Sequence, residues 1–181
     1  QPLFGNLAFE IERKKDKGVM AYHGKYNVRS FSGDELRISD VVLASNVEAE
    51  QNINGAFKRN NISVLPNPTK SFSKNEQLFL YYEIYNLTKN TNKITDFEQK
   101  ITIQKKEEGG VINSLLSVVG LDKEGKKISL TSKYQTQEKD PQMYLQLDMS
   151  KYKPGKYVIT VTIKDNKTGK EISNQTEINW L

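Results

Sequence analysis

The residues best suited to acid–base chemistry are one glutamate, Glu83, and one histidine, His23. Glu83 lies in "QLFLYYEIYNLTKN", residues 77–90, an apolar run that holds three tyrosines and a phenylalanine. A carboxylate in such a run could be buried, which would raise its pKa and suit it to act as a general acid. Glycoside hydrolysis needs a second carboxyl group, and the pair Glu107–Glu108 lies in "KKEEGG", which is typical of a solvated turn. A hydrolase that uses Glu83 is therefore the weakest of the three functions that we consider.

His23 is the only histidine, so any Ser-His-Asp triad or histidine metal site would depend on it. It stands beside Gly24 in "AYHGKY", where we expect an exposed or edge position at a turn or strand start. The chain has no cysteine, which excludes thiolate zinc sites and thiol nucleophiles. "DNKTG" (165–169) and "DKEG" (122–125) hold too few carboxylates for a calcium loop, and Gly109–Gly110 lacks the Lys-Ser/Thr of a phosphate loop. We predict no catalytic residue, no cofactor and no metal.

The distribution of charge argues against a nucleic-acid partner. The chain holds 27 Lys and Arg against 22 Asp and Glu, a net charge of +5. Beyond residue 55 the basic residues are lysines scattered through turns such as "KYKPGK", and Arg59 is the single arginine. Nucleic-acid readers favour arginine and aromatic stacking platforms, so we assign the lysines to solubility and to protection of strand edges. The sequence contains no run of 18 apolar residues, the length needed to span a membrane. We also expect that a signal peptide is absent or already removed.

The elements that must position these residues are strands, because the apolar pattern has a period of two almost everywhere. Tyr157, Ile159, Val161 and Ile163 alternate with more polar neighbours, and a second strand follows over 171–180. "DNKTGK" between them predicts a hairpin turn in which Gly169 has a positive φ. Further strands are predicted in "LFLYYEIYNL", "DFEQKITIQ", "KKISLTSKYQ" and "MYLQLDM". "VINSLLSVVG", 111–120, fits a short helix or a buried strand, and its β-branched residues favour the strand.

Strands separated by turns every 8 to 12 residues predict an antiparallel β-sandwich. "YKPGKY", residues 152–157, sharpens this expectation, because a Pro-Gly turn followed by tyrosine often enters a late strand of an immunoglobulin-like or fibronectin-like domain. In such a domain the hydroxyl of the tyrosine bonds back to the backbone, the arrangement called a tyrosine corner. We assign that role to Tyr157. The predicted fold class is therefore all-β, with an immunoglobulin-like sandwich over residues 58–181.

The first third of the chain carries a different pattern. Residues 1–45 predict two or three strands, too few for a stable sandwich of their own. Residues 46–57 are polar without a sustained period and predict a linker. The N-terminal β segment 1–45 is then either part of the main sheet system or the tail of an upstream β domain. We expect it to pair with, or pack on, the main sandwich or a neighbouring chain.

Alternation within 78–87 predicts two faces for the strand that carries Glu83. Leu80, Tyr82 and Ile84 would fill the core. The opposite face is our candidate interaction surface, formed by Phe79, Tyr81, Glu83 and Tyr85. Tyrosine clusters favour interfaces because the rings bury area and keep a polar group. An alternative is a carbohydrate-binding sandwich that stacks sugars on Tyr81, Tyr85 and Trp180.

Two further stretches resemble a known family. "LRISDVVLAS" and then "ISVLPNPTKSFSKNEQLFLYYEIYNL" are similar to the segment that precedes and enters the β-sandwich of bacterial GWxTD-domain proteins. The matching positions are Ser39, Asp40, Leu43, Ala44, Pro66, Asn67, Pro68, Phe72, Tyr82, Glu83, Ile84, Tyr85, Asn86 and Leu87. The Gly-Trp-x-Thr-Asp motif itself is absent, so the chain would correspond to the β region alone.

The resemblance implies a secreted, periplasmic or cell-envelope bacterial protein, and the family supplies no catalytic residues to transfer. Together with the composition it predicts a non-catalytic interaction or architectural module. The predicted partners are proteins, either other domains of the same polypeptide or envelope proteins.

Overall fold

A computed structural model describes residues 3–106 and 127–181, and every regular element in these two stretches is a β-strand. The chain divides into two units, Gln1–Asp34 and Glu35–Leu181. Residues 111–120, for which helix and strand were both considered, lie outside the described residues, as do Glu107–Glu108, Gly109–Gly110 and "DKEG".

The first unit is a two-stranded antiparallel hairpin of β1 (Leu3–Glu12) and β2 (Val19–Val28). Its turn is closed by the backbone N–H of Arg13, which donates to Gly18 O at 2.8 Å. Asp16 accepts from Arg13 Nε at 2.7 Å, and Lys17 adopts a positive φ of 58°. Among the described strands, β1 and β2 pair only with each other.

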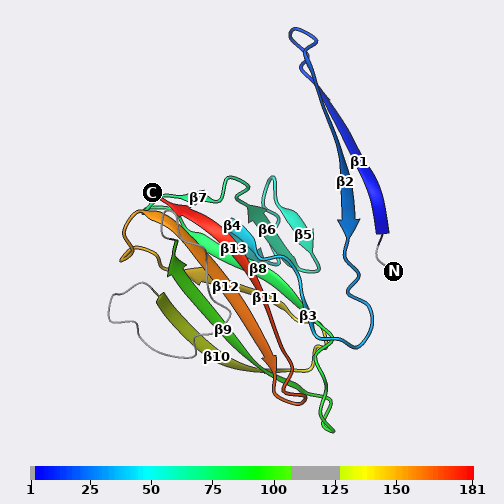
Figure 1. Cartoon of the computed structure of the whole chain (residues 1–181), viewed down its shortest axis with the longest axis vertical. Coiled ribbons are helices and arrows are strands. Elements are labelled where there is room, and N and C mark those ends of the chain that lie inside the picture. Colours follow the sequence, from blue (N-terminus) through cyan, green and yellow to red (C-terminus); the bar gives the residue numbers. More distant parts are fainter. Residues whose placement is uncertain (1–2, 107–126) are drawn as a thin grey trace. The chain divides into compact units, whose positions relative to one another are not determined.

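The second unit is a sandwich of two sheets, which confirms the predicted fold class (Figure 1). The five-stranded sheet has the order β10-β9-β12-β13-β7, and all its pairs are antiparallel except β13 with β7. Its strands are β10 (Lys127–Thr136), β9 (Thr95–Lys105), β12 (Gly155–Asp165), β13 (Glu171–Trp180) and β7 (Ser71–Phe72).

The six-stranded sheet has the order β11-β8-β4-β6-β5, and β3 adds to β8. Its strands are β11 (Gln142–Leu147), β8 (Leu78–Tyr85), β4 (Val42–Ala49), β6 (Ile62–Pro66), β5 (Phe57–Arg59) and β3 (Arg37–Ile38). β4 carries a β-bulge between Ala44 and Asn46, so that its first half pairs with β8 and its second half with β6. A bulge of this kind bends the strand and increases the local twist.

The core lies between the two sheets and is filled by the predicted alternating residues. β8 contributes Leu80, Tyr82 and Ile84, each fully buried, and β12 contributes Ile159, Val161 and Ile163. The strands therefore form because every second side chain leaves water against the opposite sheet. The turn between β12 and β13 has the predicted form, since Gly169 adopts a φ of 71° and its N–H donates to Asp165 O at 2.8 Å.

Tyr157 holds the position of a tyrosine corner. Its ring is 4% exposed, and its hydroxyl donates to the carbonyl oxygen of Lys153 at 2.6 Å, four residues upstream in the Pro-Gly turn. Tyr152 packs edge-on against the same ring, with centroids 5.6 Å apart. A local sequence signal is enough here because the turn, the strand entry and the acceptor lie within six residues.

The expected domain boundaries differ from the observed ones. Residues 46–49, placed in a linker, are the second half of β4 and pair with β6, and β3 and β4 are integral strands of the sandwich. The sandwich therefore starts at Glu35 rather than at residue 58. The segment resembles a linker in the sequence because only Val47 between Asn46 and Glu48 is buried. A strand this short, with a bulge, shows no sustained alternation.

Candidate functional site

The outward face of β8 carries the four residues that the sequence grouped together. Phe79, Tyr81, Glu83 and Tyr85 alternate with the core residues and point away from the main core, as predicted. Tyr81 is the cross-strand neighbour of Tyr144 in β11 and of Val42 in β4. The structure therefore places a carboxylate and three aromatic rings on one strand face.

The six-stranded sheet curls so that β5 approaches this face of β8. Arg59 in β5 is separated from β8 by β6 and β4, so in a flat sheet three steps would keep the strands about 14 Å apart. Arg59 Nε nevertheless lies 3.0 Å from Glu83 Oε1, and the rings of Phe57 and Tyr81 meet with centroids 5.8 Å apart. The bulge in β4 supplies the bend that makes this approach geometrically accessible.

The curl creates a second, smaller apolar core on the outer side of the sheet, which we call the outer cluster. Its buried members come from β4, β6 and β8, and Phe79 packs against them partly buried. These members are Ala44, Val47, Ile62, Val64 and Tyr81. The face of β8 that the sequence marked as a candidate interaction surface is therefore largely occupied by residues of the same chain.

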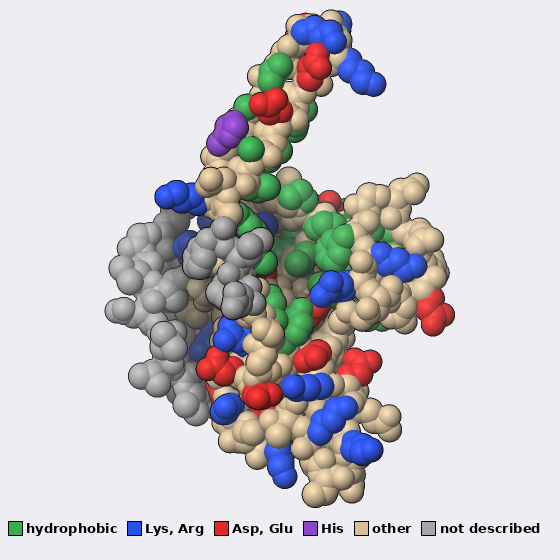
Figure 2. Space-filling model, turned by 90° about the vertical axis from the view of Figure 1, so that its right-hand side faces the viewer, with side chains coloured by type: hydrophobic (Ala, Val, Ile, Leu, Met, Phe, Trp, Pro, Cys, Tyr) green, Lys and Arg blue, Asp and Glu red, His purple; other side chains and the backbone are tan. Residues whose placement is uncertain are grey.

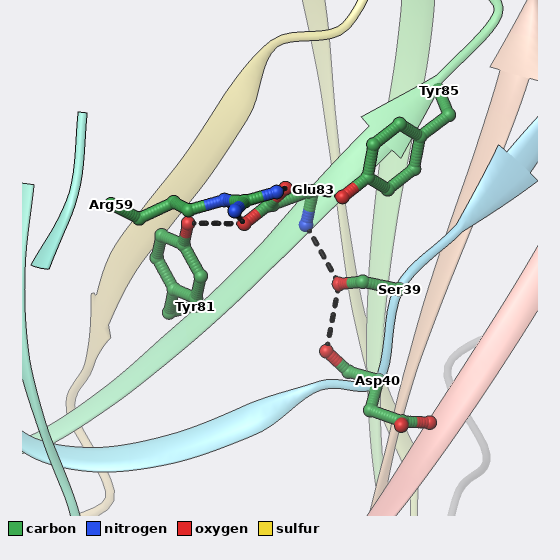
Figure 3. Close-up of polar contacts among 6 residues, drawn as sticks. All are labelled: Ser39, Asp40, Arg59, Tyr81, Glu83 and Tyr85. Atoms are coloured by element: carbon green, nitrogen blue, oxygen red, sulfur yellow. Dashed lines mark hydrogen bonds and ion pairs between the residues drawn. The ribbon is translucent and has the colours of Figure 1, made fainter. Parts of the chain in front are cut away.

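Glu83 is the polar centre of this arrangement (Figure 3). Its Oε1 accepts from Arg59 Nε at 3.0 Å and from the hydroxyl of Tyr81 at 2.7 Å. Its Oε2 accepts from the hydroxyl of Tyr85 and, at 3.4 Å, from a terminal nitrogen of Arg59. The Glu83 side chain is 12% exposed and that of Arg59 is 56% exposed, so the carboxylate is enclosed while the guanidinium borders water. We call these four residues the Glu83 clamp.

The clamp favours the charged form of the carboxylate. Burial alone pushes the pKa of Glu83 upward, but hydrogen bonds from Tyr85, Tyr81 and Arg59, together with the charge of Arg59, outweigh it and hold the pKa below its ordinary value. Burial and the bond to Glu83 raise the pKa of Tyr85 to about 12, and the same causes raise the pKa of Tyr81. The raised glutamate pKa that a general acid requires is therefore not found at Glu83.

The backbone of Glu83 is anchored as well as its side chain. Its N–H donates to Ser39 Oγ at 2.9 Å (Figure 3). Its carbonyl oxygen accepts from Ser39 N, also at 2.9 Å. Three residues on, Asn86 adopts a positive φ of 65°, a conformation that asparagine tolerates better than most residues, and its Nδ2 donates to Glu35 O at 2.9 Å. The residues of the "YYEIYNL" motif are thus all buried or held by hydrogen bonds within the chain.

Two of the predicted sugar-stacking rings are not available to a ligand, which corrects that expectation. Tyr81 is 3% exposed within the outer cluster, and Trp180 is 3% exposed within the main core. Trp180 lies at the end of β13, which pairs with β7 more than 100 residues away, and its side chain belongs to the main core. Tyr85 remains partly exposed beside Glu83.

The remaining chemical candidates include His23 and the turn "DNKTG". His23 is exposed in the middle of β2, opposite Ala8, rather than at a turn or strand start. In the part of the chain that the structure describes, no three histidine, aspartate or glutamate side chains gather as metal ligands would. Asp165, in the turn of "DNKTG", is 1% exposed, and its carboxylate caps the turn by accepting from Lys167 N at 2.8 Å.

The sequence did not predict the structural roles of three residues, Ser39, Arg59 and Asp165. Asp165 also accepts from the backbone N–H of Thr88 at 2.9 Å, a partner in a distant turn. Ser39 and Arg59 both hold Glu83, from 44 and 24 residues away. The only signals were Ser39 within the family-like segment and Arg59 as the single arginine after residue 55, and neither signal names its partner.

The hairpin presents a second candidate site, an apolar sheet face. Cross-strand pairing puts Leu7 opposite Gly24, Phe9 opposite Tyr22 and Ile11 opposite Met20 on one side. The exposed large apolar residues of this side are between 44% and 59% exposed: Leu7, Phe9, Ile11, Met20, Tyr22, Tyr26 and Val28. In Figure 2 hydrophobic side chains run along the ribbon, while lysine and arginine gather at its turn. We call this side the hairpin face.

The opposite side of the hairpin is mainly polar, although Val19, which is 65% exposed, also lies on it. It carries Asn6 with Lys25, Ala8 with His23, and Glu10 with Ala21. An amphipathic β-ribbon of this kind normally covers its apolar face, because a lone two-stranded hairpin is marginally stable in water.

No protein-family model matches the chain, and a search of curated proteins also finds no match. Among the residues that the structure describes, there is no helix with the length and apolar character needed to cross a membrane.

Proposed function

We propose that the protein is a non-catalytic interaction module, in which a β-sandwich carries an amphipathic hairpin that docks onto a protein partner. The observation that carries this proposal is the hairpin face, with seven large apolar side chains at about half exposure. Monomeric soluble proteins rarely expose a contiguous apolar patch of more than a few hundred Å², and larger patches mark interaction sites.

The Glu83 clamp supports a structural rather than a catalytic role for Glu83. Its carboxylate is held ionised by three donors from the same chain, and the nearest groups are two tyrosines and an arginine rather than a second acid. Its geometric effect is to tie β5 over β8. The clamp therefore belongs to the scaffold that presents the hairpin.

The resemblance to the β region of GWxTD-domain proteins supports the same proposal, since the matching residues have structural contacts in the sandwich. Leu43, Phe72 and Leu87 are buried in the core, and Asn67 organises its turn by accepting from Thr69 N at 3.1 Å. Membership of that family and a secreted or envelope location are part of the proposal.

Site-specific photo-crosslinking tests the docking role. A benzophenone side chain is placed at Tyr22 on the hairpin face or at His23 on the polar face of the same strand, in cells that make the protein. We expect a discrete protein adduct, identified by mass spectrometry, from position 22 and not from position 23. Phe9→Lys should abolish the adduct. Equal adducts from both positions, or none from either, would contradict the proposed function.

A further inference from the structure

We propose that the occupant of the hairpin face is the same face of a second copy of this chain, so that two hairpins form a four-stranded, two-layer sandwich. The inference rests on the proposed docking role of the hairpin and names its partner. It is carried by the aromatic packing of the face, by its area and charge, and by the lack of a comparable apolar surface among the described residues of the sandwich.

Aromatic rings cover the centre of the face. The rings of Phe9 and Tyr22 stack with centroids 5.2 Å apart and an interplanar angle of 26°. The Tyr22 ring then lies across Gly24, where an added Cβ would come within 2.6 Å of its hydroxyl. Glycine at position 24 thus lets an aromatic ring cover the centre of the ribbon. Two such faces can approach at the usual sheet spacing of about 10 Å.

The area suits a dimer. Seven side chains of this size at about half exposure present on the order of 600 Å² on each hairpin. Two hairpins meeting face to face would bury about 1,200 Å², the lower end of the range for specific protein interfaces. The pairing also turns two marginal two-stranded ribbons into a four-stranded unit with its own apolar layer.

Charge does not oppose the contact between identical faces. The described side chains of the hairpin face include no charged residue, and Glu10, Glu12 and Lys25 belong to the polar side. The basic residues of the turn, Arg13 to Lys17, sit at one end of the ribbon. In a two-fold arrangement with the ribbons antiparallel, the two basic turns lie at opposite ends of the interface.

The described residues of the sandwich offer no apolar face that would serve instead. Their exposed large apolar side chains are fewer and are spread over three strands and the chain end: Phe57 in β5, Ile128 and Leu130 in β10, Tyr144 in β11, and the terminal Leu181. Among the described surfaces, the one whose size and apolar character match the hairpin face is the hairpin face of a second copy.

Cysteine crosslinking tests the contact directly, because the chain has no cysteine of its own. Leu7→Cys places a thiol at the centre of the hairpin face, and Ala8→Cys places one on the polar side of the same strand. Because a direct disulfide cannot bridge sheets about 10 Å apart, a short bis-maleimide reagent is used, which should link the Leu7 variant into a covalent dimer and leave the Ala8 variant monomeric. Equal linking of the two variants would overturn the proposal, and both substitutions are small enough to leave the hairpin intact.

Sedimentation of the purified chain gives the second measurement. We expect a concentration-dependent dimer that Phe9→Lys weakens about 30-fold or more, as loss of a central aromatic contact does, while Ala21→Lys on the polar side leaves it unchanged. A wild-type chain that stays monomeric at all concentrations overturns the second-copy inference. If position 22 still crosslinks to a different protein, the docking role stands. If it crosslinks to nothing, both proposals fail.

Discussion

At the scale of single residues, Glu83 is a carboxylate in an apolar strand whose ionised form is stabilised by its neighbours. Three donors compensate for its burial and hold its pKa below the ordinary value. The ionised form is thus more favourable in the folded state than in the unfolded state. A group with a lowered folded pKa stabilises the protein above its unfolded pKa and loses that contribution as the pH falls through its folded pKa.

Glu83→Gln tests this role. We expect a loss of about 1 to 2 kcal/mol in the free energy of unfolding at neutral pH, because the amide keeps the shape but loses charge-assisted hydrogen bonds. Below about pH 4.5 the difference from the wild type should shrink, because the carboxylate becomes protonated first in the unfolded chain and, at lower pH, in the folded protein. Urea unfolding across pH measures both effects, and other carboxylates cancel in the comparison. A constant difference down to the lowest pH would contradict the clamp.

The same variant separates scaffold from enzyme. Glu83→Gln should change no glycosidase, esterase or peptidase activity, since we expect the wild-type chain to turn over none of these substrates. Any turnover by the wild type that disappears in the variant would overturn the non-catalytic proposal.

Tyr157→Phe removes one hydroxyl and keeps the buried ring. The lost bond to Lys153 O should lower the free energy of unfolding by about 1 kcal/mol, the usual net worth of such a bond. Tyr144→Phe is the matched control, because Tyr144 is 44% exposed on β11 and should show no change. An unaltered unfolding midpoint for Tyr157→Phe would remove the structural role of the corner.

At the scale of elements, the curl of the six-stranded sheet decides what the outer face of β8 can do. A bulge in β4 and the Arg59–Glu83 ion pair bring β5 over β8, and the outer cluster is buried beneath it. An exposed ion pair contributes little to global stability, but this one joins strands that are not neighbours in the sheet. Its effect should therefore be local.

Arg59→Gln should accelerate amide hydrogen exchange in β5 and β6 while lowering the global free energy of unfolding by no more than about 1 kcal/mol. Lys58→Gln, at the adjacent position of the same strand, is the control and should leave the exchange of β6 unchanged. Exchange rates in β5 and β6 that match those of the wild type would show that the outer cluster, rather than the ion pair, holds the curl.

At the scale of the whole molecule, the sandwich and the hairpin are separate units joined near Asp34. β4 lies between β8 and β6 and contributes Leu43 to the main core and Val47 to the outer cluster. A fragment that begins at residue 58 would therefore lose a central strand, whereas a fragment that begins at residue 35 keeps both sheets complete.

We expect the 35–181 fragment to unfold cooperatively with a midpoint close to that of the full chain, and the 58–181 fragment not to fold. The comparison should be made by urea unfolding at low protein concentration, where dimer formation through the hairpin adds little stability. Cooperative unfolding of 58–181 at the midpoint of the full chain would show that β3 and β4 are dispensable.

The sequence by itself determined the features whose causes are local. A period of two marks which side chains of β8 and β12 enter the core, a glycine with positive φ closes the β12–β13 turn, and a Pro-Gly turn places the Tyr157 hydroxyl near its acceptor. Each of these depends on residues a few positions apart, so spacing carries the information.

Only the tertiary structure decided which residues contact the side chains on the outer face of β8. Alternation puts Tyr81 and Glu83 on the outer face, but their burial depends on β5, which reaches them through a bulge and a curled sheet. Trp180 belongs to the main core at the end of a strand that pairs across the chain, and the boundary at Glu35 follows from pairing of β3 and β4. Strand order and sheet curvature arise from non-local contacts whose sequence separation is not encoded in any spacing, so chemistry that depends on them could not be read from the residues alone.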